Sequence, residues 1–563
     1  MAAEARDGSP DDPATRVFPV ATSPERPPRE SWPGRLVADE SLSVLDGGRV
    51  LVGGSPLKVL RIARPIDLDQ VLSPEVIDRL VDTGMAHPQP DSAPFSADDV
   101  TVVIPVFGQV RALSETLAAL ARMPEPAARI VVVDDASPNA DAIAATVALA
   151  GRRSTRLIRR DRNGGPAAAR NAGTQTVTTP LVAYLDAGCV PEPNWLSALL
   201  AHFADPQVAL VAPRVRADPD RWSDGDAGDE PGPSDGDEHA IGDPDGAAGR
   251  RWRAGRTDRA DLRGSIRARQ DRLRTRGRRA IARFETRRSS LDLGPEPARI
   301  APRTRVSYVP TACVVTRIDE IRRIGGFDET MRVGEDVDLV WRLARDRRLR
   351  YVPAGTVTHD VRTSPRRWLA RRFAYGTSAA QLAKRHPNGP VPVSVSPWSV
   401  AAWAGIATGH PLVGATIVAT STALLARKLS SLDDHLRLAL RLAGVGNLAA
   451  GGLLANAVRR AWWPLAIPAA AFGPKPLRRS IVAAFVIPPL LEWRPTSGID
   501  PLTWLVLCTA NDVAYGAGVW AGCVADRTAA PLLPDFAAGR ITPGAGNVAP
   551  SAGTARGKDL PPS

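Results

Sequence analysis

Alternation of apolar strands with helical periodicity between residues 100 and 215 constrains the fold of this chain more than any other feature. TVVIPVF at 101–107 is a continuous apolar run, as expected of a strand that is buried on both faces. Further runs with the composition of strands are RIVVVDDAS (129–137), TRLIRR (155–160) and PLVAYLDAG (180–188). After the first strand, apolar residues recur at helical spacing, at Val110, Leu113, Leu117 and Leu120. This order predicts an α/β fold with a mostly parallel, Rossmann-like sheet, whose ligands bind beyond the carboxyl ends of the strands.

Three carboxylates directly follow these predicted strands. Asp134 and Asp135 come after one strand, and Asp186 comes after another. A carboxylate at such a position can accept hydrogen bonds from a uracil N–H or from ribose hydroxyls, but two adjacent carboxylates are costly unless donors or cations satisfy them. We therefore expect a nucleotide near Asp134 and Asp135, with an ordinary turn after the strand as the alternative.

A glycine-rich segment, NGGPAAARNAG at 163–173, precedes a predicted helix. Glycine lets the backbone come close to a ligand, and the N-terminus of a helix attracts phosphate. Arg170 adds a guanidinium fork that suits a diphosphate or a sugar hydroxyl. The segment predicts a phosphate-binding loop, and a simple turn with a helix cap is the alternative.

An acid cluster in VGEDVDLVWRL (333–343) provides the candidates for a general base. Glu335, Asp336 and Asp338 stand at a predicted helix start, where the helix dipole lowers the cost of their charge. A base that takes a proton from a hydroxyl must be an ionised group within reach of it. Asp336 is the first choice and Glu335 the second; the alternative is a set of acids that only cap the helix.

A metal site is predicted from Asp186 in LDAGC and His359 in TVTHD. Mg²⁺ and Mn²⁺ prefer hard oxygen ligands and substrate phosphates, so Asp186 suits a divalent cation that bridges a diphosphate. His359 follows the apolar strand RYVPAG (350–355) and is the second candidate ligand. Its assignment depends on its neighbours, because a lone histidine is usually not a ligand.

The order and spacing of these motifs resemble the family 2 glycosyltransferases of the GT-A fold. The motifs that carry the resemblance are TVVIPVFG, VVVDDAS, NGGPAAARNAG, LDAG, GGFDE and GEDVDLVWRL, within residues 100–360. Three flanking segments look like those of the glycosyltransferases of the actinobacterial mycofactocin system: DGGRVLVGGSPLKVLRI, RRSSLDLGPEPARIAPRTRVSYVPTA and RRFAYGTSAAQLAKRHP.

This resemblance implies an inverting hexosyltransferase that moves glucose from a UDP-glucose donor to the peptide-derived cofactor premycofactocin and builds a short β-1,4-glucan. It implies that Asp336 is the catalytic base, with Glu335 beside it, and that Asp186 and His359 bind Mg²⁺ or Mn²⁺. The residues that it assigns to the nucleotide sugar are Pro105, Asp134, Asp135, Asn163, Gly165, Arg170 and Asp186.

The chain departs from the family pattern at two places. Where family members usually have Asp-x-Asp, this chain has Asp186-Ala187-Gly188, and glycine has no side chain that could bind a metal. The QxxRW motif of processive synthases is absent, and Arg366-Arg367-Trp368 is only a partial match, which favours a short product. Two other functions stay open: a family 2 transferase acting on a lipid or cell-wall acceptor, and a non-catalytic binding protein.

The composition divides the chain into five parts. A polar tail at 1–35 precedes a small α+β module at 36–98, with a hairpin at Asp46-Gly47-Gly48 and a helix opening at Ser73. The predicted parts after the module are the GT-A domain at 99–395 with a charged insertion at about 218–288, a hydrophobic helical region at 396–540 and a disordered tail at 541–563. The insertion has an acidic half that looks disordered and a basic half that predicts either a charged helix on a membrane or nucleic acid, or a solvated loop.

Four apolar segments make up the C-terminal region, at 412–426, 463–472, 481–491 and 501–523. The last is the longest and contains Asn511 and Asp512. Helices that lie in a membrane interface or re-enter it are favoured over a buried helical domain. Basic residues flank the segments, as contact with anionic lipid requires: Arg427, Lys428, Arg459, Arg460, Arg478 and Arg479.

The net charge of +12 also favours an anionic partner, although arginine abundance alone explains it equally well. We expect that partner to be a membrane surface and not a nucleic acid. The four cysteines lie far apart and the N-terminus has no apolar secretory segment, so the expected location is the cytoplasmic side of the cell membrane.

Overall fold

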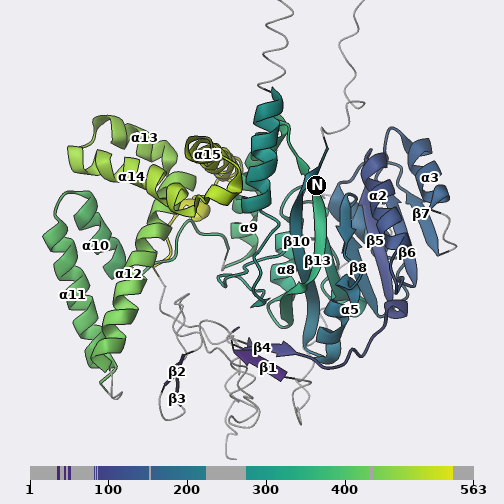
Figure 1. Ribbon diagram of the computed structural model, residues 1–563, viewed down its shortest axis with the longest axis horizontal. Coiled ribbons are helices and arrows are strands. Elements are labelled where there is room, and N and C mark those ends of the chain that lie inside the picture. The colour runs from purple at the N-terminus through teal and green to yellow at the C-terminus, as the bar shows by residue number, and fades with distance from the viewer. Residues whose placement is uncertain are drawn as a thin grey trace, which may run out of the picture.

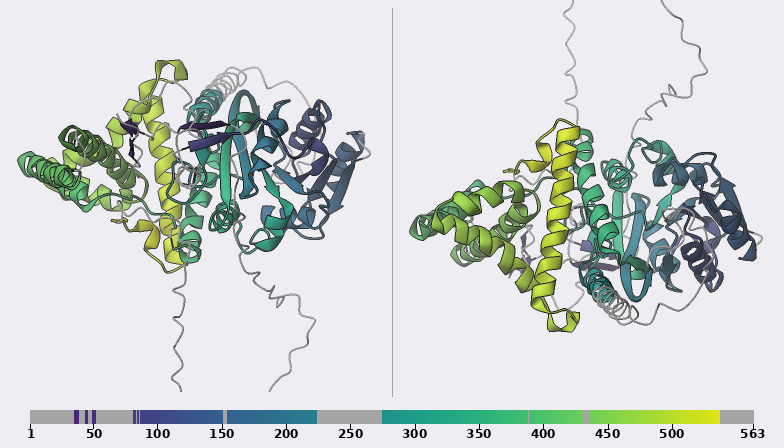
Figure 2. Two further views of the ribbon diagram at one scale, coloured as in Figure 1. Left: turned by 90° about the horizontal axis from the view of Figure 1, so that it is seen from below. Right: turned by 90° about the horizontal axis from the view of Figure 1, so that it is seen from above.

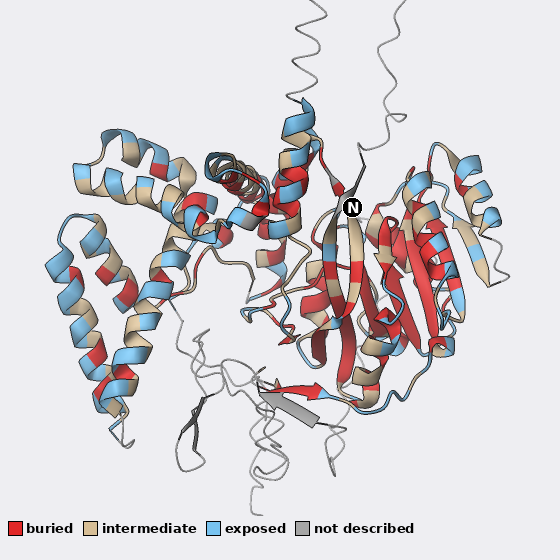
Figure 3. Ribbon diagram, in the orientation of Figure 1, coloured by how far each residue is buried: buried red, intermediate tan, exposed pale blue. Residues whose placement is uncertain are grey.

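The computed structural model describes residues 86–150, 154–223, 274–387, 389–430 and 435–536, with residues 81, 82 and 84 and three short N-terminal strands. Figure 1 shows two neighbouring parts, a sheet covered by helices and a group of C-terminal helices. The burial pattern in Figure 3 differs between them: the central strands of the sheet are almost continuously buried, whereas the outer C-terminal helices expose much of their surface. The main hydrophobic core of the described residues therefore lies in the sheet part.

The main sheet comprises, among the described residues, β5 (Val100–Val106), β6 (Arg129–Asp134), β7 (Thr155–Arg159), β8 (Leu181–Leu185), β9 (Cys189–Pro191), β10 (Val208–Ser223), β11 (Ala298–Arg299), β12 (Cys313–Arg317) and β13 (Arg348–Arg362). The strand order is β11-β13-β10-β12-β8-β5-β6-β7, and β9 pairs with β13. β5 runs parallel to both β6 and β8, and β6 runs parallel to β7. These four are the strands that the sequence predicts, so the expected parallel half of the sheet is confirmed.

The other half of the sheet is mixed. β12 is antiparallel to β8 and to β10, whereas β13 is parallel to β10 and antiparallel to β9 and β11. Every antiparallel pair in the main sheet therefore includes β12 or β13. The α/β fold class agrees with the prediction, and the antiparallel pairs close the side of the sheet that faces the C-terminal helices (Figure 1).

Helices cover both faces of the sheet, as a doubly wound fold requires. One face packs against α2 (Val110–Ala121), α3 (Ala140–Leu149) and α5 (Trp195–Leu200). The other face packs against α4 (Pro166–Thr174), α7 (Ile318–Arg323) and α8 (Glu335–Leu343). Short 3₁₀ helices lie at Ala97–Asp99, Ala201–Ala204, Pro495–Ser497 and Ala530–Leu532.

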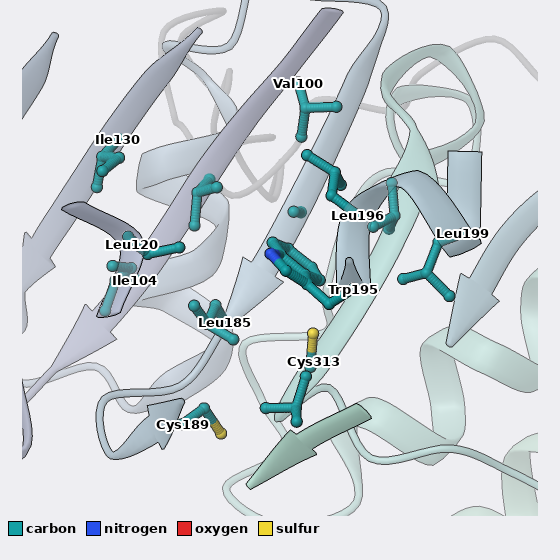
Figure 4. Packing of buried hydrophobic residues seen from close by; sticks show 14 of the residues in the cluster. Val100, Ile104, Leu120, Ile130, Leu185, Cys189, Trp195, Leu196, Leu199 and Cys313 are labelled. Carbon is teal, nitrogen blue, oxygen red and sulfur yellow. The ribbon is translucent and has the colours of Figure 1, made fainter. Parts of the chain in front are cut away.

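The two cores follow from the two-residue period of a strand, because successive side chains point to opposite faces. Ile104 of β5 packs in the first core with Leu120 and Trp195 (Figure 4), whereas its neighbour Val103 packs in the second core. The predicted helix after β5 is confirmed, and its Leu113, Leu117 and Leu120 are buried. Because helices cover both faces of the sheet, its carboxyl edge is the side that remains open to a ligand.

The N-terminal region contains β1 (Arg35–Ala38), β2 (Ser43–Leu45), β3 (Arg49–Leu51) and β4 (Ala86–Gln89). β2 and β3 pair antiparallel, which confirms the predicted hairpin, and β1 pairs with β4. The helix predicted to open at Ser73 lies outside the described residues.

The two ends of the expected charged insertion are regular structure. β10 continues to Ser223, and residues 274–288 form a helix in which Ile281 and Phe284 are buried. Phe284 contacts Trp368 and Trp504 with ring centroids 5.8 and 5.2 Å apart. Of the two alternatives for the basic half, a helix is present at 274–288, and the alternative of a solvated insertion is wrong there because Ile281 and Phe284 are buried. Residues 224–273 lie outside the described residues.

The C-terminal helices are α9 (Pro365–Arg385), α10 (Pro397–Ala407), α11 (Pro411–Lys428), α12 (His435–Arg460), α13 (Trp463–Phe472), α14 (Lys475–Glu492) and α15 (Pro501–Ala525). All four predicted apolar segments fall in helices. Among the described residues, α12 is the one helix long and apolar enough to cross a membrane, with a mean hydropathy of 1.5 over a window that is 11% buried. The sequence analysis missed α12 because its glycines and arginines interrupt the apolar run.

Glycines hold α15 against α9 at very close range, and the two helices run side by side in both views of Figure 2. A Cβ on Gly376 would collide with the backbone oxygen of Tyr515, and one on Gly518 with that of Phe373. Because α9 follows β13 directly, this contact ties the helical region to the sheet.

Candidate active site

A cleft of about 2500 Å³ lies between the carboxyl edge of the parallel strands and the C-terminal helices. It is lined from β5, from the loops after β6 and β8, from the starts of α4 and α8, and from α9, α12 and α15. The predicted site residues that line it are Pro105, Asp135, Asn163, Gly165, Arg170, Asp186, Glu335, Asp336 and His359. The fold therefore brings together residues from 105 to 359 at one edge of the sheet.

Asp134 is the predicted site residue that does not line this cleft. Its Oδ1 accepts a hydrogen bond from the backbone N–H of Ser137 at 2.9 Å, and its Oδ2 accepts one from Arg159 at 3.2 Å. The carboxylate is 1% exposed and closes the turn after β6. The alternative considered for this position, an aspartate that forms a turn, fits Asp134 better than nucleotide contact does.

Asp135 points the other way and reaches the glycine-rich loop. Its carboxylate accepts hydrogen bonds from the backbone N–H groups of Gly164 at 3.1 Å and Gly165 at 2.7 Å, and from Arg160. Ala136, which lies between Asp135 and Ser137 in the turn after β6, has a φ of 60°, a value that residues other than glycine rarely adopt. Asp134 and Asp135 are successive residues at the end of a strand, so their side chains point to opposite faces, one to the turn and one to the cleft.

The glycine-rich loop leads into α4 as the sequence predicts. Gly165 has a φ of 87° and precedes Pro166, the first residue of the helix. Arg332 lies over this loop, with its Nη1 3.2 Å from Oδ1 of Asn163. The free N–H groups of a helix start and a neighbouring arginine together form a site for an anion.

Arg170 bridges the two sides of the cleft floor. Its Nη2 donates to Asp186 Oδ1 at 2.7 Å and its Nη1 donates to Glu335 Oε1 at 3.0 Å. The side chain is almost fully buried, and its guanidinium also lies 5.4 Å from the ring centroid of Phe327. Burial would lower the pKa of Arg170, but the charges of Asp186 and Glu335 outweigh it and hold the pKa above its usual range.

Asp336 is the second residue of α8 and faces the same cleft. Its Oδ1 accepts a hydrogen bond from the backbone N–H of Val337 at 2.8 Å. Burial, and then the neighbouring charge of Glu335, raises the pKa of Asp336 from 3.8 to about 7. A carboxylate with this pKa is matched to proton transfer near neutral pH. The third acid, Asp338, instead pairs with Arg342 and His386 on the buried side of α8.

Asp186 and His359 are the candidate metal ligands, and both line the cleft. His359 lies inside β13, opposite Cys189, so the expected end of the strand before this histidine is wrong. The ladder with β9 extends the strand past residue 355. Among the described residues there is no cluster of three or more histidine, cysteine or acidic side chains that could hold a metal ion.

Gly188, at the place of the second family aspartate, has a φ of 95°. An added Cβ would have room, since its nearest neighbour is 3.6 Å away, but this φ is strained for any other residue. The glycine is therefore explained by its backbone conformation. Cys189, the next residue, is buried and is a free thiol, as are the other three cysteines.

The cleft is also lined by polar side chains that are not among the predicted site residues. Tyr308, Tyr375, Arg460 and Tyr515 come from the loop before β12 and from α9, α12 and α15. No local motif marks them, because their proximity depends on how the C-terminal helices pack on the sheet. Arg332 was detectable in principle, as a basic residue two positions before the Gly-Glu-Asp sequence.

Comparisons with known proteins identify relatives of this chain. Residues 101–256 match the family model described as glycosyl transferase family 2. The chain is 36% identical over 519 residues to the pre-mycofactocin glycosyltransferases of two strains of Mycobacterium tuberculosis, CDC 1551 / Oshkosh and ATCC 25618 / H37Rv. The match covers 88% of this chain and 97% of each relative.

Solved structures show weaker likenesses. A mannosyltransferase from Pyrobaculum calidifontis, solved with GDP-Man and Mn²⁺, is 16% identical with a TM-score of 0.39, over 76% of this chain and 90% of that one. GalNAc-T7, solved with UDP, GalNAc and Mn²⁺, is 15% identical with a TM-score of 0.31, over 54% and 53%. Similarities this low support no inference about substrates.

Proposed function

Because this chain belongs to the family 2 glycosyltransferases, in the group of the pre-mycofactocin glycosyltransferases, we propose that it transfers glucose from UDP-glucose to premycofactocin. The chain is a glycosyltransferase; the donor, the acceptor and a short β-1,4-glucan product are the proposal. The observation that carries it is the cleft, in which Arg170, Asp186 and Asp336 meet at the carboxyl edge of the sheet. The identity to the relatives spans this cleft and the C-terminal helices.

Donor binding is assigned to the loop side of the cleft. Asp135 and Asn163 present oxygen atoms beside the backbone of Gly165, where ring N–H groups and ribose hydroxyls of a nucleotide would find partners. The diphosphate would lie at the start of α4, within reach of Arg170 and Arg332. These guanidinium groups stabilise the negative charge that grows on the leaving diphosphate. Pro105 at the end of β5 completes the wall of this side.

Asp336 is proposed as the base that takes the proton from the acceptor hydroxyl. The hydroxyl then attacks the anomeric carbon from the face opposite UDP, and the configuration inverts in a single displacement. With a pKa of about 7, a substantial fraction of Asp336 is ionised at neutral pH. Glu335 is held by Arg170, so its role is to raise the basicity of Asp336 and to position the arginine.

A divalent cation, Mg²⁺ or Mn²⁺, fits Asp186 and His359 as far as the donor atoms are concerned. A carboxylate and an imidazole on the same cleft wall suit Mn²⁺, and the missing ligand at Gly188 leaves further positions to phosphate oxygens and water. When bound, the cation supplies charge neutralisation for the leaving diphosphate. Asp186 is one third exposed, so its carboxylate remains accessible although Arg170 binds one oxygen.

The test is incubation of the full-length protein with UDP-glucose, Mn²⁺ and premycofactocin, followed by mass spectrometry. The proposal expects hexose increments on the acceptor and release of UDP, and both should be lost in Asp336→Asn. UDP release without any hexose on premycofactocin would reject the acceptor and leave the transferase class intact. Unchanged transfer in Asp336→Asn would reject the assigned base.

We further propose that the outer helices contact an anionic membrane surface on the cytoplasmic side. Their large exposed apolar residues include Leu412, Val413, Leu424, Leu436, Leu440, Leu448, Leu465, Ile467, Phe472, Val482, Ile487 and Leu491. Arg427, Lys428, Arg478 and Arg479 are exposed beside them, as predicted. The prediction of lipid contact is wrong for two other arginines: Arg459 is fully buried and paired with Asp512, and Arg460 lines the cleft.

Flotation with vesicles tests this proposal. The protein should float with vesicles rich in phosphatidylglycerol and less with neutral vesicles, and the double variant Arg478→Gln/Arg479→Gln should weaken flotation. Arg122→Gln, at an exposed residue of the sheet part, is the control. The apolar surface also favours a second candidate function, transfer to a lipid acceptor, and hexose increments on added lipid in place of premycofactocin would support that function.

A further inference from the structure

The C-terminal helices bring to the cleft a polar cluster that has no role in the donor binding proposed above. Arg460, at the end of α12, and Asn511, Asp512 and Tyr515 on α15 line the same cleft as Asp336. Polar groups in helices of this composition are costly unless they have a structural or binding role. The cluster therefore calls for an explanation beyond the packing of the helices.

Arg460 has a defined orientation in the cleft. Its guanidinium carbon lies over the Tyr515 ring, 4.4 Å from the ring centroid, which is a cation–π contact. Its Nε is 3.6 Å from Oδ1 of Asp512, and 45% of the side chain remains exposed. The guanidinium is thus held over an aromatic ring, while much of the side chain stays exposed.

A buried charge pair holds this arrangement in place. Asp512 is 0% exposed, and its Oδ2 accepts a hydrogen bond from Nε of Arg459 at 2.5 Å. Asn511 donates to the other oxygen, Oδ1, at 3.0 Å. Two arginines against one aspartate leave a net positive charge, and the charge that stays exposed is that of Arg460. A cation fixed in this way is prepared to bind an oxygen-bearing or anionic group.

Tyr308 connects this cluster with the proposed base. Burial, followed by Asp336, Tyr515 and Tyr375, raises the pKa of Tyr308, whereas Arg460 lowers it. Tyr308 lines the same cleft as Asp336 and the Arg460–Tyr515 pair. A molecule with its reacting hydroxyl at Asp336 would extend past Tyr308 toward that pair.

We propose that Arg460 and Tyr515 form a subsite for the part of the acceptor that lies away from its reacting hydroxyl. The chemistry of the subsite selects a planar group that carries a carbonyl or an anionic oxygen, because an aromatic ring offers a flat surface and the guanidinium over it offers directed N–H donors. This assignment rests on the proposed function, since it takes the acceptor to be one molecule that spans the cleft. Asp512 and Arg459 position Arg460 and do not touch the acceptor.

The donor does not need this subsite. Its phosphates are assigned to Arg170, Arg332 and the start of α4, which belong to the sheet part of the molecule. Loss of Arg460 should therefore change the handling of the acceptor and leave the donor side unaffected. The test therefore compares the acceptor KM with the donor KM in the same variant.

The experiment measures steady-state transfer from UDP-glucose to premycofactocin with full-length protein, together with hydrolysis of UDP-glucose in the absence of acceptor. Arg460→Gln should raise the acceptor KM by about 10- to 100-fold, the loss expected for a charged hydrogen bond. Tyr515→Leu should raise it by about 2- to 5-fold, and Tyr515→Phe should not change it, because the ring is kept. The donor KM and the hydrolysis rate should stay at the wild-type values in all three.

Arg441→Gln is the matched control, since Arg441 is an exposed arginine on the same helix and does not line the cleft. An increase in salt should raise the acceptor KM of the wild type and have less effect on Arg460→Gln. A wild-type acceptor KM in Arg460→Gln, with transfer active, overturns the subsite and leaves the proposed function standing. Hydrolysis of UDP-glucose with no transfer to premycofactocin by the wild type overturns both.

Discussion

Arg170 Nη2 lies 2.7 Å from Asp186 Oδ1, so the carboxylate expected to ligate a metal is also the partner of a buried guanidinium. The same arginine holds Glu335 at 3.0 Å through its other terminal nitrogen. One side chain thereby fixes the end of β8 to the start of α8, and Glu335 lies 165 residues after Arg170 in the sequence. The floor of the candidate active site is built on this bridge.

Arg170→Lys should remove most of the activity and destabilise the fold. An ammonium group is a point charge and cannot hold two carboxylates in the fork geometry of a guanidinium. A buried ionic group left without its partner costs about 3–5 kcal/mol. We expect a large drop in kcat/KM and in the Tm measured by scanning fluorimetry. Arg111→Lys, in an exposed pair with Glu115, is the control, and an equal loss in both variants would contradict the argument.

The activity should depend on pH through Asp336. Burial and Glu335 raise the pKa of Asp336 to about 7, and the base must be ionised to accept a proton. The value of kcat/KM should therefore fall about tenfold for each pH unit below 7 and level off above it. A rate profile from pH 5 to 9 measures this. Asp319→Asn, at a 91% exposed aspartate, should keep the wild-type profile; a wild-type limb centred near pH 4 would refute the assignment.

The thermal stability should also depend on the protonation of Asp336, but here the protonated form is the favourable one, whereas activity requires the ionised form. With the pKa raised from 3.8 to about 7, the folded state binds a proton that the unfolded chain releases in this window. The stabilising contribution of the protonated form is present below about pH 4 and is lost as the pH rises through 7. The Tm of Asp336→Asn relative to the wild type should therefore rise between pH 4 and pH 8. A constant difference across this range would show that the folded pKa is not raised.

The parts of the fold that the sequence predicts are those with a local signal. β5, β6 and β8 are short apolar runs, and the aspartates at their ends follow from their position in the chain. The strand period places Asp134 and Asp135 on opposite faces, but which of the two lines the cleft depends on how β6 lies in the sheet, and no local signal predicts that. Similarly, the orientation of Arg460 in the cleft depends on its contact with Tyr515, which α15 brings from a distant part of the chain.

Gly188 offers a test of why the second family aspartate is absent. Its φ of 95° is strained for any other residue, so Gly188→Ala should lower stability by about 1–3 kcal/mol although a Cβ has room. Gly188→Asp should show the same loss, because the strain arises from the backbone and not from the carboxylate. Gly277→Ala, in a helix with no neighbour within 4 Å, should instead be neutral or stabilising. Gly188 variants as stable as the wild type would mean that the backbone does not require glycine here.

The contact between α9 and α15 should be the most sensitive junction between the two parts of the molecule. A Cβ on Gly518 would collide with the backbone oxygen of Phe373, and backbone cannot move aside as a flexible side chain can. We expect Gly518→Ala to lower the free energy of unfolding by about 1–3 kcal/mol, the usual cost of overpacking. Tm and limited proteolysis measure this, with Gly452→Ala on α12, where an added Cβ meets nothing within 4 Å, as the control. Because α15 also carries Tyr515, Gly518→Ala should raise the acceptor KM without changing the hydrolysis of UDP-glucose. Loss of hydrolysis in Gly518→Ala would show instead that the sheet part depends on α15 for its own folding.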